Sequence, residues 1–84
     1  MNHKEIKKRH AEITSRYLAG KTLQEFGDAI GRKRQEVYMW KVGKQSPPPV
    51  MLMKIVKFQN GASWVVGWAK ECLDVYLDRR NNGK

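Results

Sequence analysis

The sequence predicts a small all-α protein built from five short helices. Five stretches of the 84-residue chain repeat apolar residues at helical spacing, and Gly, Asn and Pro residues separate these stretches. No stretch combines the alternation of a half-buried strand with the turn chemistry of a hairpin. A chain of this length holds one domain rather than two, so all five helices are expected to share one core.

The first helix is predicted to run from Lys4 to Ala19. Asn2 followed by Glu5 has the spacing of a capping box at its start, and Gly20 supplies a stop at its end. Its expected buried stripe holds Ile6, Ile13 and Tyr17, with His10 on the same side as a partly buried residue.

The second helix is predicted from Leu23 to Ile30. Thr22 and Glu25 form a capping-box pair at its start, and Gly31 closes it. Its apolar and small residues are spaced i, i+3, i+4, i+7, which is typical of one buried helix face: Leu23, Phe26, Gly27 and Ile30.

The third helix is predicted from Arg34 to Val42, and the fourth begins after Ser46 and is ended by Asn60 and Gly61. Val37 and Trp40 are the inward pair of the third helix. Ser46 is a suitable N-cap for the fourth, and Pro47 follows it in the first turn, where a missing N–H has no cost. The core stripe of the fourth helix is expected to hold Leu52, Ile55 and Val56.

The fifth helix is predicted from Trp64 to Arg79 and carries more apolar surface than a monomer needs. Its apolar residues fill an arc of about 220°, whereas packing on a core needs a stripe only a little over ~100° wide. Surplus apolar surface of this size usually marks an interface. We therefore expect a homodimer through this helix, with an interface of Trp64, Val65, Trp68, Ala69, Cys72, Leu73 and Tyr76. The alternative is that the helix is central and wrapped by the other four.

The net charge of +9 points to a polyanionic partner. The charge is uneven: residues 1–61 carry 13 Lys and Arg against five Asp and Glu, and residues 62–84 carry four against three. We therefore divide the domain into a basic four-helix unit, residues 1–61, which is expected to bind the polyanion, and a C-terminal dimerisation helix, residues 62–84. The single Cys72 cannot form an internal disulfide, which fits a reducing cytoplasm, and is expected to be a buried apolar residue. No apolar run is long enough to span a membrane.

At residues 4–60 the chain resembles the lambda-repressor/Cro-like helix-turn-helix family. The resemblance rests on the spacing of Phe26, Gly27, Ile30, Gly31, Val37 and Trp40, followed by Gly43, Lys44 and Pro47. One departure is Lys33, which stands where the family usually has Ser before the second helix of the motif. The resemblance implies a five-helix DNA-binding fold with the helix-turn-helix at the second and third helices. It also implies a sequence-specific regulator of bacterial or phage type that binds double-stranded DNA in the cytoplasm at the nucleoid.

The expected DNA contacts follow from the helical geometry of the third helix. Its outward face lies opposite Val37 and Trp40, and the start of such a helix reaches base edges in the major groove. We predict base contacts from Arg34, Gln35, Tyr38 and Met39. We predict phosphate contacts from Thr22, Gln24, Lys33, Lys41 and Lys44. In the alternative, Arg34 and Gln35 are solvated surface residues, and Met39 and Val42 pack against the turn at residues 47–49.

No nucleophile elbow, phosphate loop or metal-ligand spacing is present in the sequence, so a non-enzyme without cofactor, metal or small-molecule ligand is expected. A dimeric repressor is the function that these patterns favour. One alternative is an antitoxin-type DNA-binding protein whose fifth helix binds a toxin. Another is an interaction adaptor that has lost DNA binding. RNA and membrane partners fit less well, because the aromatic residues are spaced for a core and no single helix is both basic and apolar along its length.

Overall fold

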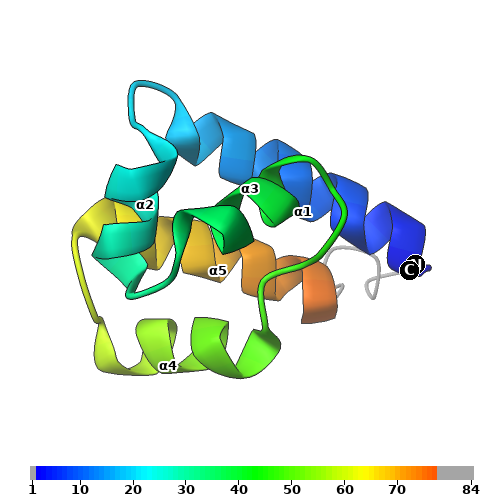
Figure 1. Ribbon diagram of the computed structural model, residues 1–84. Helices are drawn as coiled ribbons and strands as arrows, with labels where there is room; N and C mark the ends of the chain where they lie inside the picture. The colour runs from blue at the N-terminus through cyan, green and yellow to red at the C-terminus, as the bar shows by residue number, and fades with distance from the viewer. Residues whose placement is uncertain (1, 78–84) are drawn as a thin grey trace.

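The computed structural model describes residues 2–77 and contains five α-helices in that part of the chain, with no strand. They are α1 (His3–Leu18), α2 (Leu23–Ile30), α3 (Arg34–Lys41), α4 (Pro49–Phe58) and α5 (Ser63–Leu77) (Figure 1). The predicted all-α class and the number of helices are confirmed. The predicted end of the fifth helix, Arg79, lies outside the described residues.

The helix starts show which capping signals operate. The Asn2 side chain accepts a hydrogen bond from the Glu5 backbone N–H at 2.8 Å, so Asn2 is the N-cap, and α1 begins at His3, one residue before the predicted start. Both bonds of the predicted capping box at α2 are present: the Glu25 N–H donates to the Thr22 hydroxyl at 3.0 Å, and the Thr22 N–H donates to the Glu25 carboxylate at 2.8 Å. The prediction for α4 is wrong: its N-cap is Pro48, and Ser46 lies outside the helix.

Ser46 is not a cap because its hydroxyl takes part in a contact with α1. The His10 ring is fully buried, with Nδ1 2.9 Å from Ser46 Oγ and Nε2 2.9 Å from the Cys72 carbonyl oxygen. A carbonyl only accepts, so Nε2–H donates to Cys72 and Nδ1 accepts from the hydroxyl. Tyr76 lies against the His10 ring and donates its hydroxyl to the Pro47 carbonyl at 2.6 Å. This cluster fixes the α3–α4 loop on α1 and α5, and it corrects the expectation that His10 is only partly buried.

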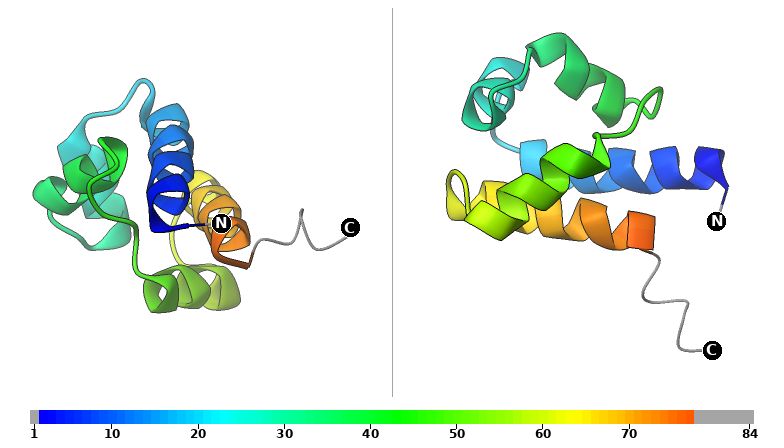
Figure 2. Two further views of the ribbon diagram at one scale, coloured as in Figure 1. Left: turned by 90° about the vertical axis from the view of Figure 1, so that its right-hand side faces the viewer. Right: turned by 90° about the horizontal axis from the view of Figure 1, so that it is seen from below.

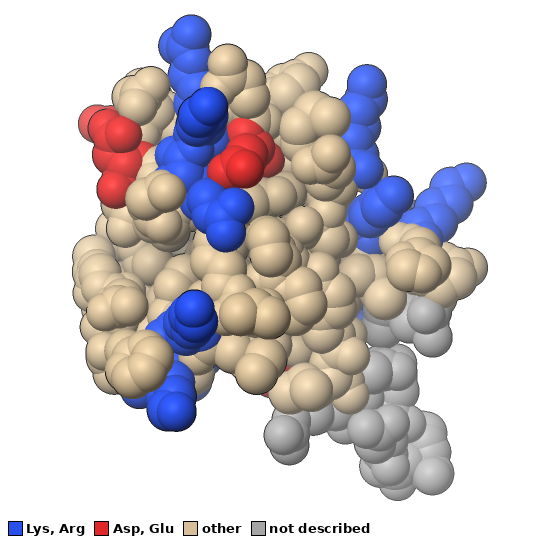
Figure 3. All heavy atoms as spheres, turned by 60° about the horizontal axis from the view of Figure 1, so that its bottom comes forward, with Lys and Arg blue, Asp and Glu red and all other residues tan. Residues whose placement is uncertain are grey.

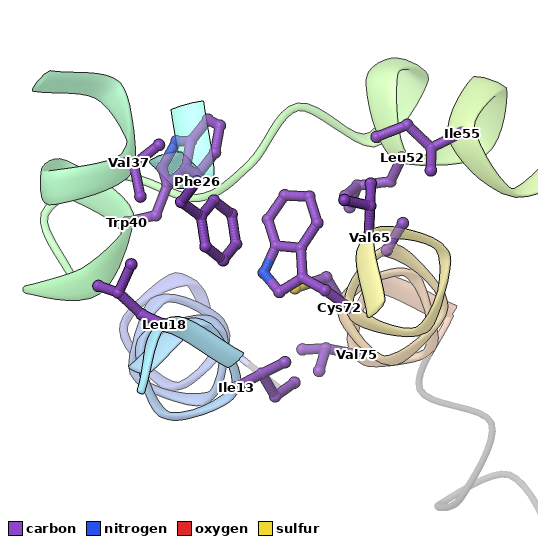
Figure 4. Close-up of a cluster of buried hydrophobic side chains, with 12 residues drawn as sticks. Ile13, Leu18, Phe26, Val37, Trp40, Leu52, Ile55, Val65, Cys72 and Val75 are labelled. Carbon is purple, nitrogen blue, oxygen red and sulfur yellow. The ribbon is translucent and has the colours of Figure 1, made fainter. Parts of the chain in front are cut away.

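The core is shared by all five helices and is centred on α5 (Figures 2 and 4). α1 and α4 both pack on α5, and α1 runs antiparallel to it, since His10 meets Cys72 and Thr14 meets Trp68. The Trp68 side chain is fully buried and donates Nε1–H to the Thr14 hydroxyl at 3.1 Å. Its ring contacts Phe26 of α2 edge-on at 5.2 Å and stacks on Trp40 of α3 at 5.7 Å between centroids.

The wide apolar arc of α5 packs largely against the other helices of the same chain, which excludes four of the seven residues predicted for the dimer interface. Of the seven residues assigned to that interface, Val65, Trp68, Ala69 and Cys72 are at most 1% exposed. Trp64, Leu73 and Tyr76 are half-buried against the core. The polar arc of α5 is also engaged, because Glu71 accepts hydrogen bonds from Arg16 and Tyr17 of α1. The alternative that the fifth helix is central therefore describes the structure, and neither a second copy nor a toxin can bind the four buried residues.

Candidate nucleic-acid interface

The junction between α2 and α3 is a tight turn that depends on two glycines. Gly31 ends α2 with a φ of 73°, in the left-handed region that a residue with a Cβ rarely adopts. The Arg32 N–H then donates to the Gly27 carbonyl at 2.9 Å, so the turn folds back onto α2. A Cβ on Gly27 would lie 2.5 Å from the Arg32 carbonyl oxygen. Without a side chain, Gly27 lets the turn that leads into α3 pass close to α2.

Buried residues set the rotation of α3 about its axis. Val37 and Trp40 are at most 2% exposed, and they face Phe26 of α2 and Trp68 of α5. The opposite side of α3 is therefore turned to solvent. It carries the exposed side chains of Arg34, Gln35, Tyr38 and Val42, as the helical geometry predicts.

The exposed side of α3 and the start of α2 together form a groove of about 510 Å³. It is lined by Thr22, Leu23, Gln24, Arg34, Gln35 and Tyr38. Five of these six are among the predicted DNA contacts, and they come from two separate segments of the sequence. Leu23 is the sixth, and the sequence pattern assigned it only to the buried face. The Leu23 side chain is half-buried, so it both packs against the core and lines the groove. Its position directly after the N-cap of α2 is the signal that could have revealed this second role.

The residues predicted to contact bases are free to bind a ligand. Within residues 2–77, neither Arg34 nor Gln35 has a side-chain hydrogen bond or ion pair. Lys33, the N-cap of α3, provides no side-chain hydrogen bond, so the first-turn N–H groups of α3 lack the cap that Ser would supply. Gln24 differs, because its amide N–H already donates to Asp28 at 2.8 Å.

The remaining predicted contacts lie at α3 and in the loop that follows it. Lys33 and Lys41 are exposed at the two ends of α3, and Lys44 is exposed in the loop that follows. Met39 is half-buried beside the exposed face, and its carbonyl accepts from the Lys44 N–H at 3.0 Å. Met39 is therefore less accessible than the other three predicted base contacts.

The local electrostatics favour an anion. Residues 32–44 hold five cations and one carboxylate, a local charge of +4. That carboxylate, Glu36, pairs with Arg32 at 3.5 Å, and the nearby Glu25 accepts within the capping box. Lys21 is turned away from the groove, because its ammonium group lies 4.4 Å from the Trp64 ring centroid. Among the described residues, the unpaired cations of the segment 32–44 are thus those of Lys33, Arg34, Lys41 and Lys44, and Arg34 lines the groove.

Within residues 2–77 there is little that would form a metal site, a reactive cysteine or a membrane span. Within residues 2–77, no three His, Cys, Asp or Glu side chains are grouped so that they could hold a metal ion. Cys72 is fully buried, as expected, and its burial raises the pKa of its thiol. No described helix is both long and apolar enough to cross a bilayer. Comparisons with protein-family models, curated proteins and solved structures found no match to this chain.

Proposed function

We propose that the protein is a sequence-specific regulator that binds double-stranded DNA through a helix-turn-helix formed by α2 and α3. One observation carries the proposal: Arg34 and Gln35 are exposed and unpaired on the outer face of α3, beside the start of α2, in a region of charge +4. Cationic groups around a projecting helix suit a duplex, because phosphates surround the groove that the helix enters.

In the proposed complex, α3 lies in the major groove with its first turn toward the bases. Arg34 has the fork geometry for guanine O6 and N7, and Gln35 for adenine N6 and N7, each contact giving about 1–3 kcal/mol of discrimination. Tyr38 reaches a phosphate or a base edge, and Met39 contacts a thymine methyl group. Lys33, Lys41 and Lys44 bind phosphates and set the position of α3 without reading sequence. The first-turn N–H groups of α2, together with Thr22 and Gln24, bind phosphates of the same DNA backbone.

The proposed regulator acts as a repressor that occupies a promoter, with two copies on half-sites about 34–36 Å apart. The pairing of the two copies uses none of the four buried α5 residues. The chain has no catalytic part in this proposal, and it acts in the cytoplasm.

Selection of bound sites from random duplex DNA tests this proposal. We expect an enriched two-fold symmetric consensus. If six phosphates are neutralised, log affinity for that site falls with log salt with a slope of about −5. The absence of any enriched sequence, or a binding curve that salt does not change, would show that the proposal is wrong. Enrichment of a single half-site would show that one copy binds alone.

Two substitutions separate base reading from electrostatic attraction. Arg34→Ala should weaken binding to the selected site about 5- to 150-fold and relax the preference at one base pair, since it removes about 1–3 kcal/mol of discrimination. Lys57→Ala on α4 removes the same charge away from the groove, and it should leave the sequence preference unchanged. Equal effects of the two substitutions on preference would exclude Arg34 as a reading residue.

A further inference from the structure

The outer face of α4 is apolar and exposed, and the function proposed above does not use it. Val50, Met53 and Phe58 are 61%, 53% and 59% exposed. With Lys54 and Lys57 they recur at i, i+3, i+4, i+7 and i+8, so all five lie on one side of the helix. We call these five residues the α4 face. The opposite side of α4 is in the core, where Leu52 and Ile55 are at most 6% exposed.

A groove of about 350 Å³ runs beside the α4 face. Val50 and Lys54 belong to both, and the groove continues past Met51 to Ile30 and Arg32 at the end of α2. Its lining includes Ile30, Ile55 and Val65, and its charged groups are Arg32 and Lys54. None of its lining residues also lines the groove between α2 and α3, so the two surfaces can be occupied at the same time.

The charges on the α4 face itself are all positive. From Val37 to Lys70 the sequence contains no Asp or Glu, while it contains five lysines, two of them on the α4 face. Figure 3 brings α4 toward the viewer and shows a mostly uncharged surface with basic groups, and the acidic groups that stand out lie in the upper part of the view. An apolar stripe with cations on it complements an apolar stripe with carboxylates on it.

We propose that the α4 face and its groove bind an amphipathic helix of a partner protein, one that carries Asp or Glu beside its apolar residues. The helix lays its apolar side on Val50, Met53 and Phe58, and its carboxylates pair with Lys54 and Lys57. This is the helix-in-groove mode, in which anchors at i, i+3, i+4 and i+7 fill an apolar surface. The regulator would then bring this partner to its DNA site.

A second copy of the chain is a poorer occupant. Two-fold pairing through α4 would place the same surface on both sides, so that Lys54 and Lys57 would face the lysines of the other copy. Like charges placed together across an interface are unfavourable. Nucleic acid also fits poorly, because large exposed apolar side chains gain nothing from phosphate.

Selection from a displayed library of helical peptides, with the surface positions randomised and the full chain as bait, tests this inference. We expect the enriched peptides to carry Leu, Ile or Phe at i, i+3, i+4 and i+7, with Asp or Glu in excess over Lys and Arg at the flanks. The enriched peptide should shift the methyl resonances of Met53 and Met51 in a methionine-labelled sample. Met39, which lies on α3, serves as the internal control and should not shift.

Charge reversal supplies the matched comparison. Lys54→Glu with Lys57→Glu should weaken the enriched peptide at least tenfold, and Lys8→Glu with Lys70→Glu, at exposed positions outside α4, should change its affinity less than twofold. Thermal unfolding by circular dichroism checks that both double variants are folded. Binding to the selected DNA site is measured separately, so failure of the proposed function does not decide this result.

Several results would overturn the inference. Enrichment of basic peptides, no enrichment at all, or shifts at Met39 in place of Met53 would each do so. A Met53 shift that grows with protein concentration without peptide, together with a dimer in sedimentation equilibrium, would assign the α4 face to a second copy. A Met53 shift with vesicles containing phosphatidylserine, but not with the peptides, would assign it to a lipid surface.

Discussion

Substitution of Gly27 by Ala tests whether the approach of α2 to the following turn sets the geometry of α3. In an ordinary helix interior this change is stabilising, by roughly 0.5–1 kcal/mol. Here the new Cβ would lie 2.5 Å from the Arg32 carbonyl oxygen and 3.4 Å from the Arg34 nitrogen, both backbone atoms. Because a backbone carbonyl cannot rotate away as a flexible side chain does, the turn or the helix has to move.

The magnitude follows from two opposing contributions. Overpacking of a well-packed site costs typically about 1–3 kcal/mol, and the helix propensity of Ala returns roughly 0.5–1 kcal/mol. The difference is a net loss of up to about 2.5 kcal/mol in the free energy of unfolding, and about 1 kcal/mol at the centre of the two ranges. For a domain of this size a loss of about 1 kcal/mol lowers the unfolding midpoint by roughly 4–8 °C. Affinity for the selected DNA site should fall as well, since Arg34 begins α3 at the displaced turn.

Ala29→Gly is the matched control, because Ala29 is exposed on the same helix. It removes a Cβ and should cost roughly 0.5–1 kcal/mol from backbone entropy alone. If helix propensity decided both substitutions, Gly27→Ala would raise the midpoint and Ala29→Gly would lower it. Because the turn lies close to α2 in the structure, we expect both substitutions to lower the midpoint of thermal unfolding followed by circular dichroism. A higher midpoint for Gly27→Ala would refute this close approach.

Three further predictions concern stability and reactivity. Burial lowers the pKa of His10 below its ordinary value of 6.5, so below about pH 6.5 the unfolded chain binds more protons than the folded chain. The free energy of unfolding measured in urea should therefore be constant above that pH and decline below it. His10→Gln should flatten this decline. Thr22→Ala breaks the capping box with Glu25 and should cost about 0.5–2 kcal/mol in the same assay, whereas an unchanged midpoint would mean that the cap adds nothing. The Cys72 thiol is fully buried with a raised pKa, so a disulfide reagent should modify it only after unfolding; rapid modification of the native protein would contradict the placement of α5.

The parts of the fold that depend on neighbouring residues were predictable from the sequence. The capping box of Thr22 and Glu25 and the glycine stop at Gly31 are decided within one turn of chain, and both are present in the structure. The outward face of α3 was also predictable, because Val37 and Trp40 fix the inward direction of this short helix. This local geometry accounts for the exposure of Arg34.

The start of α4 was not predictable in the same way. Ser46 is a good N-cap by its type and position, yet its hydroxyl hydrogen-bonds His10, 36 residues earlier. A local signal of about 1 kcal/mol is overridden when a buried imidazole nitrogen would otherwise lack a partner, since an unsatisfied buried polar group costs about 1–3 kcal/mol. Only the packing of α1 against the α3–α4 loop reveals this competition.

The sequence alone does not reveal that the apolar arc of α5 is covered within the chain. A hydrophobic arc measured on an isolated helix does not tell how many neighbours will cover it, and α5 is covered by packing with α1, α4 and the aromatic residues of α2 and α3. Residues 62–84 carry four Lys and Arg against three Asp and Glu, so their low net charge reflects a balance of signs and gives no evidence of a partner. α5 contributes to the proposed recognition through packing. Trp68 stacks on Trp40, and Trp40 sets the rotation of α3 that turns Arg34 outward. Within residues 2–77, three of the six exposed large apolar side chains lie on α4, beside two lysines, so a protein partner is proposed there rather than on α5.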